Sequence, residues 1–144
     1  MDEGEIGGSI KAIAAPPRKL EQPELFKVEL AIYSYLLQPQ FWTGGEYSAV
    51  FVQGPDEEFD AVSRQFPNHV PPIKPRGRAE LLPNQTLVDR DTGRPAMILS
   101  VVARDATGDT VQADGRWFAG AVVSGFRTFT LQQTNGDWRI ERVK

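Results

Sequence analysis

The chain contains one histidine, His69, in the proline-rich stretch PNHVPPIKPRGR at residues 67–78. Histidine is the side chain most often used for general acid–base chemistry and for metal binding near neutral pH. A multi-histidine metal site cannot be built from one histidine, and prolines at positions 67 and 71 flank this one. We therefore predict that His69 is a loop residue and that the chain has no catalytic histidine.

The same stretch carries three basic residues, Lys74, Arg76 and Arg78, in alternate positions. In an extended segment this spacing places all three side chains on one side. Together they would suit a carboxylate, a phosphate or an acidic surface of a partner protein. The acidic stretch PDEEFD at 55–60 offers internal counter-charges, so a solvated loop is the alternative interpretation.

Tyrosine and aspartate residues are the other candidates for acid–base catalysis. A ketosteroid-isomerase type of site combines a carboxylate base with an oxyanion hole made by a tyrosine and a protonated acid. The candidates are Tyr33, Tyr35, Tyr47, Asp89, Asp91 and Asp105. No motif selects which of them would converge, so a small lyase or isomerase is the alternative function and not the preferred one.

Metal and cofactor chemistry is not expected. The Asp-x-Asp spacing in DRDTGRP, residues 89–95, resembles a calcium loop, but two arginines stand among the would-be ligands and the distant glutamate of an EF-hand is missing. We predict a turn there. The chain has no cysteine, which excludes disulfides, thiolate nucleophiles and zinc–thiolate or iron–sulfur sites.

Composition indicates one soluble globular domain. The chain has 144 residues, of which 40% are hydrophobic and 24% charged, and its net charge is −3. This charge argues against a nucleic-acid binder, and the longest apolar stretches, such as AMILSVVA, are too short to span a bilayer. Residues 1–19 show no periodicity and predict a flexible arm. They contain no export signal, which predicts a cytoplasmic protein; an exported protein whose signal peptide was removed is the alternative.

Hydrophobic periodicity predicts the elements of the first two thirds. Apolar residues at three- and four-residue spacing indicate a helix over 22–38, bounded by Pro23 and Pro39. A β-branched and aromatic run at 46–54 predicts a strand, and acids followed by apolar residues on one face predict a short helix over 55–66. Residues 67–95 carry six prolines and little periodicity, so we expect a long, extended and ordered loop.

The last third reads as four antiparallel strands, at 96–104, 110–120, 122–133 and the closing WRIERV. Asn135-Gly136 is a strong hairpin signal because both central residues of a type I′ turn need positive φ. The apolar run 96–104 predicts a central strand. The expected fold class is α+β, with the helices packed on one face of a curved antiparallel sheet that ends in a four-strand meander.

This order of elements, and the closing stretch GFRTFTLQQTNGDWRIERV in particular, resembles the NTF2-like, cystatin-like superfamily. The resemblance covers residues 22–144 and implies a bent sheet that wraps a helix to form a cone, within a single domain over 20–144. It also implies an uncharacterised bacterial member that forms a homodimer through its sheet.

We interpret the chain as a non-catalytic NTF2-like domain that binds a protein partner or a small apolar ligand. The candidates for lining a pocket in the cone are Tyr33, Phe51, Trp117 and Phe129.

Overall fold

The computed structural model describes residues 16–144 and shows an α+β fold, as predicted. Two α-helices, α2 (Glu24–Leu36) and α3 (Asp56–Gln65), and two short 3-10 helices, η1 (Pro39–Trp42) and η2 (Arg76–Arg78), accompany the strands. The strands are β1 (Val50–Val52), β2 (Ile73–Pro75), β3 (Ala79–Leu81), β4 (Leu87–Asp89), β5 (Met97–Ala103), β6 (Thr110–Phe118), β7 (Ser124–Thr134) and β8 (Asp137–Val143).

Both predicted helices are confirmed, and their boundaries follow from local sequence. Helix α2 begins directly after Pro23 with an acid, Glu24, in its first turn, where the helix dipole favours negative charge. It ends before Pro39, which opens η1. Helix α3 follows Pro55, carries three acids in its first turn and stops before Pro67, which cannot continue a helix.

Six strands form one sheet in the order β2-β1-β5-β6-β7-β8, and β3 and β4 form a separate hairpin. Strands β5 to β8 pair antiparallel with their neighbours in sequence, and β5 has partners on both sides, as predicted for a central strand. Asn135 and Gly136 have φ of 54° and 83°, so the predicted turn between β7 and β8 is confirmed.

The sheet is mixed, and the prediction of a purely antiparallel sheet is wrong. Strand β1 pairs parallel with both β2 and β5. Parallel neighbours need a crossover connection, and α3 supplies it between β1 and β2. The predicted loop 67–95 is therefore not one loop, because it contributes β2, β3 and β4. Strand β2 lies at the sheet edge, where the missing N–H of Pro75 breaks no central ladder.

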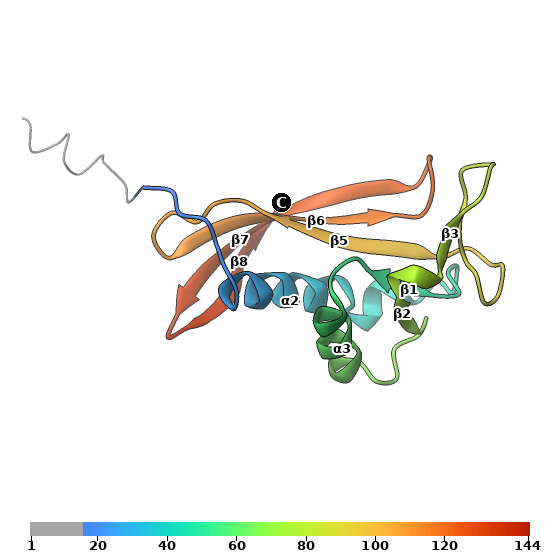
Figure 1. Cartoon of the computed structure of the whole chain (residues 1–144), viewed down its shortest axis with the longest axis horizontal. Coiled ribbons are helices and arrows are strands. Elements are labelled where there is room, and N and C mark those ends of the chain that lie inside the picture. The colour runs from blue at the N-terminus through green and yellow to red at the C-terminus, as the bar shows by residue number, and fades with distance from the viewer. Residues whose placement is uncertain (1–15) are drawn as a thin grey trace, which may run out of the picture.

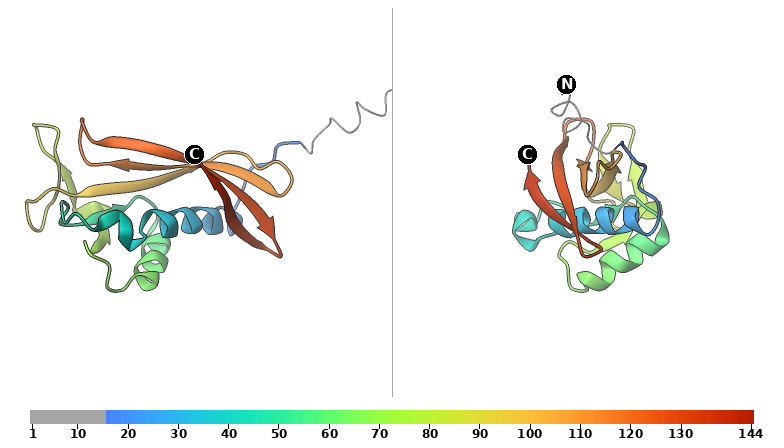
Figure 2. Two further views of the ribbon diagram at one scale, coloured as in Figure 1. Left: turned by 180° about the vertical axis from the view of Figure 1, so that it is seen from behind. Right: turned by 90° about the vertical axis from the view of Figure 1, so that its left-hand side faces the viewer.

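The sheet curves over α2, and the β7–β8 end bends down past the first half of that helix (Figures 1 and 2). A β-bulge between Thr130 and Leu131 interrupts the β7–β8 register there, and bulges increase local twist and bend. Helix α3 lies beside α2 on the side away from the sheet. The main core lies between α2 and the sheet and includes Ile32, Leu36, Leu99, Phe129 and Leu131.

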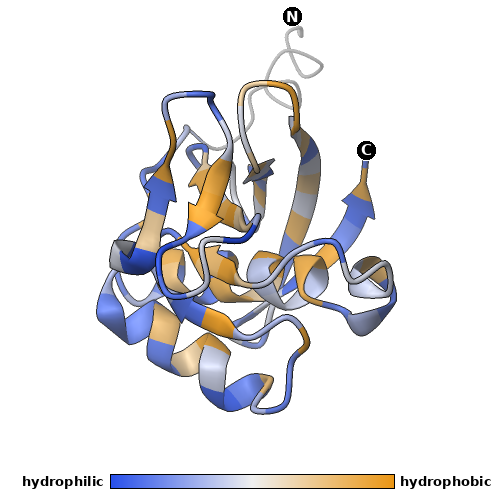
Figure 3. Ribbon diagram, turned by 90° about the vertical axis from the view of Figure 1, so that its right-hand side faces the viewer, coloured by the Kyte–Doolittle hydropathy of each residue, from blue (hydrophilic) through white to orange (hydrophobic). Residues whose placement is uncertain are grey.

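A second, smaller core lies on the opposite face of the sheet, where the β3–β4 hairpin covers one end of it. Its buried members are Ala49, Phe51, Ala79, Leu87, Ala96 and Ile98. The connection between β6 and β7 beside it exposes an apolar tip, with Val122 95% exposed (Figure 3). The β3–β4 hairpin of the proline-rich segment thus covers this second core.

Residues 16–19 of the predicted N-terminal arm are docked, since the Arg18 backbone exchanges hydrogen bonds of 2.9 and 2.8 Å with Ala106. The Arg18 side chain also forms an ion pair of 2.8 Å with Glu24 at the start of α2. The rest of the arm, 1–15, lies outside the described residues.

Helix α2 approaches the sheet most tightly at Gly115 of β6. A Cβ atom there would lie 2.7 Å from Cε1 of Phe129 and 2.9 Å from Cγ2 of Ile32, closer than carbon atoms pack. Both neighbours are fully buried, so neither can move aside into solvent. The distance between the helix and the sheet thus depends on the absence of a side chain at residue 115.

We expect Gly115→Ala to lower the free energy of unfolding by about 1–3 kcal/mol, because the added methyl group overpacks the core. Gly77→Ala is the matched control, since a Cβ at Gly77 meets no heavy atom within 4 Å. Urea unfolding followed by circular dichroism measures both. Equal stability of the two variants would contradict the account of Gly115.

Candidate functional site

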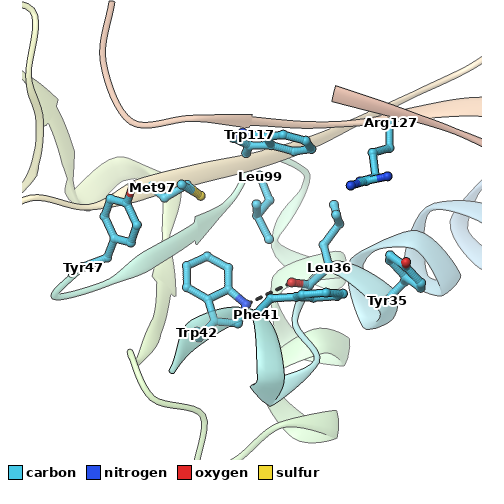
Figure 4. A pocket seen from close by; sticks show the side chains of 9 residues that line it. All are labelled: Tyr35, Leu36, Phe41, Trp42, Tyr47, Met97, Leu99, Trp117 and Arg127. Carbon is cyan, nitrogen blue, oxygen red and sulfur yellow. Dashed lines mark hydrogen bonds between the residues drawn. The ribbon is translucent and has the colours of Figure 1, made fainter. Parts of the chain in front are cut away.

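A cavity of about 240 Å³ opens beyond the C-terminal end of α2, between η1 and the inner face of the sheet. Aromatic and aliphatic side chains form most of its wall (Figure 4). The lining residues are Tyr35, Leu36, Phe41, Trp42, Tyr47, Met97, Leu99, Trp117 and Arg127. This cavity is the candidate functional site.

The wall opposite the sheet is built by η1. Pro39 starts this turn three residues after the end of α2, and Phe41 and Trp42 point toward the cavity (Figure 4). The indole N–H of Trp42 donates a hydrogen bond of 2.9 Å to the Leu36 carbonyl, an unsatisfied acceptor at the helix end. Tyr47 meets the Trp42 ring edge-on with a centroid distance of 6.2 Å. These contacts fix the orientation of this wall.

The sheet wall depends on a pairing between Trp117 and Gly125. They are directly opposed on β6 and β7, and a Cβ at Gly125 would lie 2.6 Å from the Trp117 indole. Because Gly125 has no side chain, the indole lies flat across β7 at the cavity wall. Met97 and Leu99 of β5 complete the surface beside it.

In the described part of the chain, Arg127 is the one charged residue that lines the cavity. It lies opposite Gly115 in the β6–β7 ladder and on the same side of β7 as the buried Phe129. Within residues 16–144 its guanidinium forms neither a hydrogen bond nor an ion pair (Figure 4). The site thus combines an apolar interior with one uncommitted cation.

The four residues suggested by the sequence for a pocket do not meet there. Trp117 lines the cavity, whereas Tyr33 and Phe129 are fully buried in the main core and Phe51 in the second core. Tyr33 donates a hydrogen bond of 2.7 Å to the Gln53 carbonyl, and burial raises the pKa of its hydroxyl well above its usual value. Sequence reasoning missed Phe41, Trp42 and Arg127, although two adjacent aromatic residues after a helix-ending proline were a usable signal.

His69 connects two segments of backbone. Its Nε2 lies 2.9 Å from the Leu37 carbonyl at the end of α2, and its Nδ1 lies 2.7 Å from the Pro71 carbonyl. The ring packs edge-on against Trp42 and Phe66. His69 therefore fastens the proline-rich segment to α2 behind the cavity wall, as a residue that positions Trp42.

Two of the three basic residues in the proline-rich segment have internal partners. Lys74 Nζ lies 2.6 Å from Oδ2 of Asp89 and 3.2 Å from Oδ2 of Asp91, and Arg78 pairs with Asp91. The hydrogen bond with Asp89 raises the pKa of Lys74, and the Arg78 and Lys74 side chains lower the pKa of Asp91. Arg76 donates only to Gln53 Oε1, at 3.3 Å. The counter-charges come from Asp89 and Asp91 and not from the acidic stretch at 55–60.

The stretch DRDTGRP forms the predicted turn. Gly93 has a φ of 70° and donates its N–H to the Asp89 carbonyl at 2.7 Å. Asp89 is 0% exposed, and its Oδ1 accepts the Asp91 N–H at 3.1 Å. Within residues 16–144 no three potential metal ligands lie close enough together to hold an ion.

We expect Lys74→Met to destabilise the fold by about 2 kcal/mol, because it leaves the buried Asp89 carboxylate without its ion-pair partner. Arg76→Met is the control. It removes the same charge from the same segment, but Arg76 has no buried ion-pair partner, so the variant should change stability by less than about 0.5 kcal/mol. Chemical denaturation measures both variants. Losses of equal size would show that the ion pair does not anchor the segment.

One buried acid was not recognised from the sequence. Glu58 in the first turn of α3 is 1% exposed, lies against Gly54, and leaves its Oε2 without a partner among the described residues. Burial raises the pKa of its carboxyl to about 8, and the neighbouring Glu29 of α2 adds to the rise. It is not part of the cavity wall.

The raised pKa of Glu58 predicts a stability that falls with increasing pH. Between about pH 4.5 and 8, the Glu58 carboxyl is protonated in the folded state and ionised in the unfolded chain. The free energy of unfolding therefore decreases as the pH rises through this window. Glu58→Gln should flatten this dependence and stabilise the protein at pH 9 by on the order of 1–3 kcal/mol. Unfolding curves from pH 5 to 9 provide the measurement, and a wild-type stability that rises over this window would contradict the assignment.

Comparisons of the chain with protein-family models, with curated proteins and with solved structures found no match. No helix in the described part of the chain is both long and apolar enough to cross a membrane. The functional interpretation therefore depends on the geometry of the cavity.

Proposed function

We propose that the chain is a non-catalytic NTF2-like domain that binds a small apolar ligand in the cavity at the end of α2. The observation that carries this proposal is the cavity wall, which has five aromatic and three aliphatic side chains and a single charged one. Small-molecule sites are typically concave and apolar, with few polar groups that orient the ligand. The sheet that curves over α2 supports the NTF2-like interpretation.

The cavity favours a small ligand. Its 240 Å³ is below the ~300–1,000 Å³ usual for drug-sized molecules. Several aromatic rings surround it and suit a flat apolar ligand, because stacked and edge-on ring contacts add binding free energy beyond that of apolar burial. The wall is also fixed by the Trp42 hydrogen bond, so little ordering is required on binding.

A small lyase or isomerase is the second candidate. The tyrosines that it requires, Tyr35 and Tyr47, are present at the cavity. Such an enzyme also needs a carboxylate base, and no aspartate or glutamate of residues 16–144 lines the cavity. Asp89 and Asp91 are paired with Lys74, and Asp105 is exposed after β5. The tyrosines alone favour binding over proton transfer.

A protein partner would use another surface. The outer face of the sheet exposes Val102 by 46% and Phe126 by 61%, and Arg76 and Arg116 line a groove beside Phe126. The homodimer through the sheet and the anionic partner for Lys74, Arg76 and Arg78 both stay predictions. They are independent of the cavity.

The proposed function predicts that a neutral planar probe, naphthalene-2-carboxamide, binds to the wild-type chain. Met97→Trp should weaken this binding by at least about tenfold, because the larger side chain fills the cavity. Val102→Trp is the matched control, since Val102 lies on the same strand but on the outer face. Isothermal titration calorimetry measures affinity, and circular dichroism verifies folding. Absent wild-type binding, or equal binding by both variants, would overturn the proposal.

A further inference from the structure

We infer that the ligand of the cavity is a small planar carboxylic acid whose carboxylate pairs with Arg127. This inference rests on the proposed function and adds the chemical class of the ligand. The residue that suggests it is Arg127, because an apolar cavity does not require a charged side chain in its wall.

The position of Arg127 is unusual for a strand arginine. The side chains of β7 that share its face, Phe129 and Leu131, are fully buried against α2. Arg116, which belongs to the opposite face of the sheet, has an acid within reach, with Nη2 3.6 Å from Oδ2 of Asp114. Arg127 has no such partner within residues 16–144. Its side chain is exposed, so water solvates the guanidinium in the free chain, and a ligand carboxylate would replace that water.

The surroundings of Arg127 fit a monoanion. Tyr35 lies on the same side of the cavity, and its hydroxyl forms no hydrogen bond with the described residues (Figure 4). One guanidinium fork and one hydroxyl donor match the two oxygens of a carboxylate, since arginine binds carboxylates bidentately. A phosphate dianion has more oxygens and charge than this donor set satisfies. Among residues 16–144, no acidic side chain lines the cavity to oppose an anion.

The rest of the wall accounts for the planar body. Trp117 lies flat along the sheet side, and Phe41 and Trp42 face it from η1 (Figure 4). A ring system inserted between these surfaces contacts aromatic groups on both sides. Its carboxylate would then project to the open side of the cavity, where Arg127 is exposed.

The test compares two probes of the same shape, naphthalene-2-carboxylate and naphthalene-2-carboxamide, by isothermal titration calorimetry at pH 7. For the wild-type chain we expect the carboxylate to bind at least about tenfold more tightly, since hydrogen bonds to a charged partner are stronger. Arg127→Gln should abolish this preference, measured as the ratio of the two affinities. Added salt should reduce the preference in the wild type.

Arg139→Gln is the control for net charge, because Arg139 is an exposed arginine of β8 without a partner among the described residues. It should retain the full preference for the carboxylate. Equal binding of both probes to the wild type, or a preference that survives Arg127→Gln, would overturn the inference and leave the proposed function intact. Failure of the wild-type chain to bind the carboxamide would overturn the proposed function together with the inference.

Discussion

The close contact between α2 and β6 at Gly115 determines how the rest of the molecule is arranged. With no side chain at residue 115, Ile32 and Phe129 pack close to the backbone of β6, and the helix lies close against the sheet. The curved sheet extends past the helix end at Leu36, where no further helical turn fills the space. Aromatic side chains from η1 line this space without closing it. The cavity is thus a consequence of a helix shorter than the sheet that it supports.

The proline-rich segment stabilises the other face of the same sheet. The Lys74–Asp89 pair joins β2 to the end of β4, and the β3–β4 hairpin covers the second core around Phe51. Lys74 is 22% exposed and Asp89 is 0% exposed, so the carboxylate is held in a water-poor environment where an unpaired charge would be costly. His69 fixes the beginning of the segment to the end of α2. The residues that looked most reactive in the sequence therefore hold the fold together.

Arg127 and Glu58 are two ionisable residues that have no oppositely charged partner among residues 16–144. Arg127 faces an apolar cavity without an acid, and Glu58 is buried beside Glu29 between the two helices. Natural sequences tolerate such conflicts mainly where a site or a switch requires them. Arg127 lines a cavity, and its exposed guanidinium is available to a ligand there. Glu58 is not among the residues that line this cavity, and its buried carboxyl bears on stability.

The sequence by itself determined both helices, the strands β5 to β8, the β7–β8 turn and the exclusion of cysteine chemistry. These features depend on local periodicity, on proline boundaries and on the positive φ of Asn135-Gly136, which the chain specifies without distant contacts. Only the tertiary structure decided the parallel pairing of β1, the partners of Lys74 and the identity of the cavity wall. Those depend on contacts between segments far apart in the chain, such as the pairing of β1 with β5, and no local pattern encodes which segments will meet.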